Sequence, residues 1–203
     1  GLVLRFYIIR EGYIIDDFNL LFSADILENH LKGRPQPQIH FSHEEDLLET
    51  GGGIKKGLKA MRQEPFFVVS GDSLWTDGPG GSALARMQET WNAEEMDILI
   101  LLQPVSRMVL TPGVGDYDID ANGHAIRQTD KSGAYMWTSV RICNPAIFDD
   151  TPDEPFSFLE LLDKAEAAGR LFALIHDGEW YHITTPEDLD TINNALAGHK
   201  IYA

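Results

Sequence analysis

Two short stretches contain residue types that could bind a charged ligand. The first is the glycine run Gly51–Gly53, preceded by Glu49 and Thr50, and the second is Asp72, which follows Gly71. Glycine lets the backbone approach a ligand closely, and N–H groups at a helix start lack intrahelical partners and favour anions. A carboxylate after a buried strand lies where open α/β sheets bind ligands. Together the stretches predict a site for a nucleotide or phosphorylated ligand, with a cation at Asp72.

Each stretch also has a purely structural interpretation. The glycine run could be a flexible connection, and Gly71 with Asp72 could form a plain turn. His182, at the end of a predicted strand, is either a site residue or an ordinary hydrogen-bonding residue. The strands and helices predicted around the first two stretches favour a ligand-binding role over a purely structural one.

The elements that would position these stretches follow from apolar periodicity. Strands are predicted at 66–70 and 97–102, and helices at 54–62 and 82–91, with a loop at 72–81. This alternation indicates a parallel, doubly wound sheet. Further along, the sequence predicts a hairpin turn at Asn122-Gly123, strands at 134–143, 171–176 and 179–183, a helix at 158–168, and a last helix capped by Thr185.

The start of the chain is harder to interpret. Residues 1–4 have the character of a short buried strand, 38–42 that of another strand, and 23–31 that of a helix. The stretch from Arg5 to Asp17 is apolar and aromatic, but it has neither a clear period nor turn residues. No element is predicted there, and we infer that residues are missing near Arg5.

Composition limits the class of protein. A length of 203 residues predicts a single domain over 1–203, and 43% hydrophobic with 24% charged residues is typical of globular proteins. The net charge of −16 argues against a nucleic-acid partner. The lone Cys143 excludes an intramolecular disulfide and suits a reducing cytoplasm. No apolar run approaches the roughly 20 residues of a membrane span, so we expect a cytoplasmic protein without a membrane partner; the oligomeric state stays open.

Three motifs resemble the sugar-1-phosphate nucleotidyltransferase family, and within it the N-acetylmuramate-1-phosphate uridylyltransferase group. They are Glu49–Ile54, then Gly71-Asp72 with Trp75-Thr76-Asp77, then the pattern Trp-x-x-Ile-x-Thr-Pro-Glu-x-Leu over 180–189. The resemblance covers residues 30–197. It implies a three-layer, Rossmann-like α/β fold, with a mixed, mostly parallel sheet and helices on both faces. It also implies Mg²⁺-dependent attack of a sugar-1-phosphate oxygen on the α-phosphorus of an NTP and release of pyrophosphate. UTP is the expected donor, and a guanylyltransferase is the alternative.

The resemblance assigns roles position by position. Glu49, Thr50, Gly51, Gly52 and Gly53 would line the base pocket, Asp72 would bind the metal, and Trp137, Thr138 and Ser139 would face the sugar. Relatives also carry a Gly-rich loop with an arginine, and Arg5 is the candidate for that arginine here, so the resemblance makes Arg5 and Asp72 the candidate catalytic residues. His182 stands where many relatives have an aspartate metal ligand. Imidazole suits Mn²⁺ better than Mg²⁺, so Mn²⁺ is an alternative cofactor.

Two other functions remain open. A nucleotide- or sugar-binding regulatory module that has lost catalysis would account for the missing loop and for His182. A nucleotide-sugar glycosyltransferase is disfavoured, because Asp72-Ser73-Leu74 lacks the Asp-x-Asp metal motif.

Overall fold

The computed structural model describes residues 8–10, 13–20, 29, 32–33, 39–43, 47–59, 64–111 and 113–197. The predicted strand at 1–4, Arg5 and most of the predicted helix at 23–31 lie outside them. No helix in these ranges is long and apolar enough to cross a membrane.

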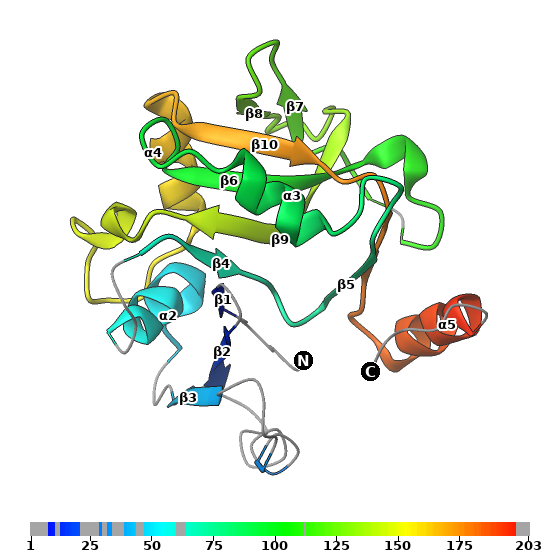
Figure 1. Ribbon diagram of the computed structural model, residues 1–203, viewed down its shortest axis with the longest axis horizontal. Helices are drawn as coiled ribbons and strands as arrows, with labels where there is room; N and C mark the ends of the chain where they lie inside the picture. Colours follow the sequence, from blue (N-terminus) through cyan, green and yellow to red (C-terminus); the bar gives the residue numbers. More distant parts are fainter. Residues whose placement is uncertain are drawn as a thin grey trace.

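The central sheet is mixed, as predicted (Figure 1). Strand β9 runs antiparallel to both of its neighbours, β4 and β6, while β6 and β10 are parallel. Strands β4, β6 and β10 therefore share one direction, but the reversed β9 makes most described pairings antiparallel. In this respect the sheet is less parallel than the strand–helix alternation predicted. Its strands are β4 (Phe66–Val68), β6 (Ile98–Pro104), β7 (Tyr117–Ile119), β8 (Ala125–Arg127), β9 (Tyr135–Cys143) and β10 (Leu171–Ile175).

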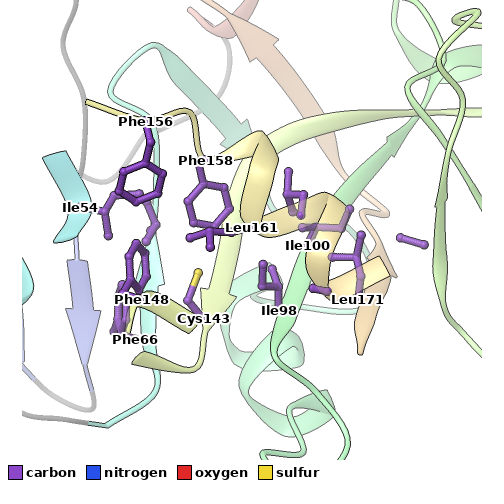
Figure 2. Close-up of a cluster of buried hydrophobic side chains, with 14 of the residues drawn as sticks. Ile54, Phe66, Ile98, Ile100, Cys143, Phe148, Phe156, Phe158, Leu161 and Leu171 are labelled. Atoms are coloured by element: carbon purple, nitrogen blue, oxygen red, sulfur yellow. The ribbon is translucent and has the colours of Figure 1, made fainter. Parts of the chain in front are cut away.

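Helices cover both faces of this sheet, which confirms the three-layer prediction. Alternate side chains of a strand point to opposite faces. Ile98, Ile100 and Leu102 of β6 pack in the cluster with α2 and α4, while Leu99 and Leu101 pack with α3. Figure 2 shows the first cluster, with Ile54 of α2, Phe66 of β4 and Leu161 of α4. The helices are α2 (Glu49–Leu58), α3 (Ala83–Thr90) and α4 (Leu159–Ala167).

The first strands form a separate three-stranded sheet. Strand β2 (Tyr13–Leu20) lies between β1 (Ile8–Arg10), which is antiparallel to it, and β3 (Ile39–His43), which is parallel. The prediction that no element forms between Arg5 and Asp17 was therefore wrong for the described residues. The stretch is rich in isoleucine and tyrosine, which favour strands even where apolar and polar residues do not alternate. Strand β3 confirms the strand predicted at 38–42.

A two-stranded ribbon connects the middle of the chain to its last part. Strand β5 (Ser73–Thr76) pairs antiparallel with β11 (Glu179–His182). The loop predicted over 72–81 is therefore wrong for its first half, because the pairing partner lies more than a hundred residues later. Helix α5 (Pro186–Leu196) follows, with Thr185 and Asp188 forming a capping box, so the predicted cap is confirmed.

Tightly packed glycines hold the ribbon together at its far end. A Cβ added to Gly178 would lie 1.9 Å from the Thr76 carbonyl oxygen, and one on Gly78 would lie 2.4 Å from the Asp177 carbonyl carbon. The Gly80 N–H donates to Asp177 Oδ2 at 2.7 Å. Only glycine permits these approaches, so the two segments are fixed against each other.

Candidate functional site

Asp72 and His182 meet at the near end of the ribbon. His182 Nε2 lies 3.0 Å from Asp72 Oδ2, although 110 positions separate the residues. The register explains this contact, because β5 begins directly after Asp72 and its first residue, Ser73, pairs with His182. The Ile183 N–H also donates to the Asp72 carbonyl oxygen at 2.8 Å. The pairing that the metal-site prediction requires is therefore built into the ribbon.

Both side chains of this pair are accessible. The Asp72 side chain is 42% exposed and that of His182 is 35% exposed. The His182 ring stacks on Trp180, with centroids 5.7 Å apart, and the His182 N–H donates to Thr111 Oγ1 at 3.2 Å. The imidazole is thus held against Trp180 and the His182 main chain against Thr111, while Asp72 remains open to a ligand.

The donor set fits a cation that is completed by substrate oxygens. Adjacent ligands of an octahedral Mg²⁺ with bonds of 2.0–2.1 Å lie about 3.0 Å apart. The Asp72–His182 separation matches that spacing as well as it matches a hydrogen bond. In the part of the chain that the structure describes, no group of three or more His, Cys, Asp or Glu side chains could hold a metal by itself. Mg²⁺ commonly uses one or two carboxylates together with waters and substrate phosphates.

The glycine run lies inside α2, not before it. The helix begins at Glu49 and ends at Leu58, whereas residues 54–62 were predicted. Glu49 itself has φ of 57°, an unusual value for a residue other than glycine. Gly51, Gly52 and Gly53 are buried in the first turns of the helix.

Phe156 occupies the space beside these glycines. The N–H groups of Gly51 and Gly52 donate to the Phe156 carbonyl oxygen at 2.9 and 3.3 Å. A Cβ on Gly51 would lie 2.3 Å from the Phe156 ring. In this conformation the glycines serve packing, and a nucleotide contact with these two N–H groups requires Phe156 to move. The base-binding role of Glu49, Thr50 and the glycines stays a prediction.

Strand β9 carries the residues predicted to face the sugar, and it contains a bulge. The register with β6 shifts between Ile100 and Leu102, and Ser139 has φ of 64°. The fully buried Thr138 donates through Oγ1 to the Leu101 carbonyl oxygen at 2.7 Å, so its hydroxyl stabilises the bulge. Ser73 Oγ donates to the Thr138 carbonyl oxygen at 3.0 Å. The bulge is therefore tied to the residue next to Asp72.

The bulge gives a direct stability prediction. Serine in the left-handed region is strained, by roughly 1–2 kcal/mol, and glycine is not. We expect Ser139→Gly to raise the free energy of unfolding by about 0.5–1 kcal/mol, after the greater backbone entropy of glycine is subtracted. Urea unfolding measures this change, and a decrease in stability would show that the serine side chain makes a stabilising contact.

Arg141, two residues past the bulge, was not singled out in the sequence. Its side chain is 1% exposed, and burial lowers the pKa of its guanidinium to about 10. The guanidinium carbon lies 3.9 Å from the centre of the Phe158 ring and 5.1 Å from that of Trp137. A single basic residue inside the apolar run 140–143 was the signal available in the sequence.

The predicted residues thus fall into three groups. The ribbon joins Asp72 to His182, and Ser73 connects this pair to Thr138 and Ser139 of β9. Glu49–Gly53 lie at the start of α2, toward the other end of β4 from β5 (Figure 1). Arg5 lies outside the described residues.

The chain is similar in sequence to known sugar-1-phosphate nucleotidyltransferases. No family model matches the chain. The chain is 33% identical, over 83% of its length and 72% of the relative's, to an N-acetylmuramate α-1-phosphate uridylyltransferase from Caulobacter vibrioides. It is 26% identical, over 74% of its length, to a D-glycero-α-D-manno-heptose 1-phosphate guanylyltransferase from Aneurinibacillus thermoaerophilus, of which it spans 64%.

The fold also matches a solved structure. The crystal structure of HddC from Yersinia pseudotuberculosis, complexed with GMP-PN, superimposes with a TM-score of 0.66 at 24% identity. The match covers 86% of this chain and 75% of HddC, and it bears on the fold alone. The sequence identity to the Caulobacter relative extends over most of both chains and shows the family. The chain belongs to the sugar-1-phosphate nucleotidyltransferase family.

Proposed function

We propose that the chain transfers UMP from UTP to a sugar-1-phosphate, with a divalent cation held at Asp72 and His182. The Asp72–His182 pair, formed by the first β5–β11 register position, is the observation that carries this proposal. The uridylyltransferase from Caulobacter supports UTP as the donor. The net charge of −16 means that a polyphosphate needs a local positive centre to bind, and a cation provides one.

The chemistry demands positioning more than acid–base catalysis. An oxygen of the sugar phosphate forms a bond to the α-phosphorus, and the bond from that phosphorus to the bridging oxygen breaks. Pyrophosphate leaves with the electron pair. The attacking oxygen is already an anion, so no protein base is needed. When bound, the cation neutralises charge on the phosphate oxygens.

The residues of the site have separate tasks in this proposal. Asp72 supplies the hard oxygen ligand, and the ribbon fixes its main chain through the Ile183 N–H. His182 either ligates through Nε2 or orients the Asp72 carboxylate, because it lies 3.0 Å from Oδ2. A nitrogen ligand would favour Mn²⁺ over Mg²⁺. We place the enzyme in the cytoplasm, where UTP and a reduced Cys143 are expected.

One observation favours the binding module as the second candidate. Phe156 takes the two glycine N–H groups that a base would need, at 2.9 and 3.3 Å. If Phe156 never moved, these N–H groups would stay unavailable to UTP, and the protein would lack a complete site for the nucleotide that donates UMP.

Pyrophosphate release separates the two candidates. The protein is incubated with UTP, GTP, CTP or dTTP, with several sugar-1-phosphates, and with Mg²⁺, Mn²⁺ or EDTA. We expect release with UTP at least about tenfold faster than with the other nucleotides, and none with EDTA. Absence of release from every pair, with UTP binding retained in calorimetry, would establish the binding module instead.

A further inference from the structure

A small cavity lies where the chain before α4 packs against the first turns of α2. The Phe156 N–H donates to the Leu48 carbonyl oxygen at 3.3 Å, and a Cβ added to Gly52 would lie 3.6 Å from the Glu154 carbonyl oxygen. The cavity measures about 240 Å³, which is small for an organic ligand and suits a compact group. Its lining residues are Leu48, Gly52, Lys55, Lys56, Lys59, Pro152 and Asp153.

This cavity is positively charged in a protein that is strongly negative. The chain as a whole has 32 Asp and Glu against 16 Lys and Arg. Among the residues that line the cavity the balance is reversed, with three lysines against one aspartate. Clefts lined by one sign of charge concentrate ions of the opposite sign. The cavity is therefore a place where a small anion is attracted, although the net charge of −16 repels anions elsewhere.

Lys55 is held in position for such an anion. Its Nζ donates to the Thr151 carbonyl oxygen at 2.6 Å and to the Pro152 carbonyl oxygen at 3.2 Å, and it lies 3.0 Å from Asp153 Oδ1. An ammonium group has three donors, so two are used by main-chain atoms and the third by Asp153. The Asp153 side chain is 82% exposed. Asp153 is thus the one partner of Lys55 that an anion can replace without any movement of the main chain.

Lys59 adds a second charge on the same face of α2. Residues four apart on a helix are neighbours, and like charges at that spacing destabilise the helix. Hydrogen bonding and charge from Lys55, and then the charge of Lys59, lower the pKa of Asp153, so both ammonium groups lie close to that carboxylate. One carboxylate therefore faces two cations, and an anion with two charges would compensate both.

We propose that this cavity binds a small phosphate anion, with Lys55 and Lys59 as its main ligands in place of Asp153. Phosphate is favoured over a carboxylate because it carries almost two charges at neutral pH and presents more acceptor oxygens. Lysine recognises it as a point charge. The site lies at α2, toward the other end of β4 from the ribbon that carries Asp72 and His182 (Figure 1). It goes beyond the proposed function and does not depend on it.

Calorimetry in the presence of EDTA tests the site. Orthophosphate, pyrophosphate and glycerol 3-phosphate are titrated at constant ionic strength, and EDTA excludes phosphate bound through a cation at Asp72. We expect saturable binding of at least one of them with a Kd of about 1 mM or below. The tightest of the three identifies the ligand as inorganic or as an ester. Absence of saturation with all three up to about 10 mM overturns the proposal.

Lys59→Met locates the bound anion. Losing one charged hydrogen-bond partner should raise Kd about tenfold or more, and Tm should hardly change because Lys59 is exposed. Lys164→Met is the matched control, since Lys164 is an exposed lysine in the last turn of α4 and does not line the cavity. It should leave Kd unchanged. Equal weakening by both substitutions would show a general effect of net charge, and an unchanged Kd in Lys59→Met would place the anion elsewhere; either result overturns the site.

Asp153→Asn gives the opposite expectation. Removal of the competing carboxylate should lower Kd about threefold, the amount expected of an exposed ion pair. Asp150→Asn makes the same change in charge three residues earlier, at a residue that does not line the cavity, and should have almost no effect. Weaker binding in Asp153→Asn would mean that the anion does not replace Asp153 and would overturn the proposal. These titrations contain neither nucleotide nor divalent cation, so their failure leaves the proposed function untouched, just as absence of pyrophosphate release leaves the phosphate site untouched.

Discussion

Asp72→Asn is expected to abolish pyrophosphate release, with kcat reduced by about 10³-fold or more. Asparagine has nearly the same shape but no charge, so it holds a divalent cation poorly, and losing one preorganised charge-stabilising group costs about 10²–10³ in rate. The fold should survive, because the Ile183 N–H bonds to the main-chain carbonyl and not to the side chain. Steady-state kinetics with UTP and circular dichroism measure the two effects.

A distant aspartate provides the control for that substitution. Asp150 is exposed in the turn after the short helix Pro145–Phe148. Asp150→Asn changes the net charge by the same amount and should retain wild-type turnover. If Asp72→Asn also retained turnover, Asp72 would not be a metal ligand, and the cation site would have to be sought elsewhere.

Gly178→Ala is expected to destabilise the protein strongly. The new Cβ would lie 1.9 Å from the Thr76 carbonyl oxygen and 2.9 Å from the Gly78 nitrogen, both backbone atoms that cannot rotate away. Overpacking of this kind costs typically 1–3 kcal/mol, and we expect the upper end of that range. Because the ribbon holds Asp72 against His182, turnover should fall as well. Urea unfolding and pyrophosphate release measure both effects on the same variant.

Gly113→Ala is the matched control for the glycine packing. Its Cβ would also be crowded, at 2.5 Å from Met136 Sδ and 2.6 Å from Met108 Cε. Those atoms are the ends of flexible side chains that can repack. The alanine should therefore cost well under 1 kcal/mol, within the range of tolerated substitutions. Equal destabilisation by both substitutions would mean that the ribbon can separate to accommodate Gly178→Ala.

The sequence predicted elements with strong local signals and missed those defined by distant partners. The apolar run at 97–102 and the Ser82-capped helix at 82–91 were found within two residues of their observed limits, because burial and capping are local properties. The antiparallel direction of β9 relative to its neighbours could not be predicted from local sequence. A strand carries no local mark of whether its neighbours run with it or against it. Strand β5 was missed for a related reason, because turn residues surround its four-residue length.

The residues of the candidate site also divide into those that the sequence could predict and those that it could not. Asp72 and His182 were predicted as a pair from the family resemblance, and the structure brings them together. The packing of Phe156 on Gly51 could not be predicted, because glycines needed for a ligand and glycines needed for a ring are the same residue type. Arg141 was missed because a single basic residue in a strand has no motif, and only its burial and unpaired nitrogens make it distinctive.

The position of β9 between β4 and β6 has a consequence for folding. Phe66–Val68 of β4 pair with Arg141–Cys143 of β9. Among the described strands of the central sheet, β4 therefore gains its hydrogen-bonded neighbour only after about 75 further residues have been synthesised. The Asp72–His182 contact closes later still, across 110 positions. Long-range pairings of this kind slow folding. The contact between Asp72 and His182 therefore cannot form before β11 has been synthesised, because the register of β11 with β5 is what brings the two residues together.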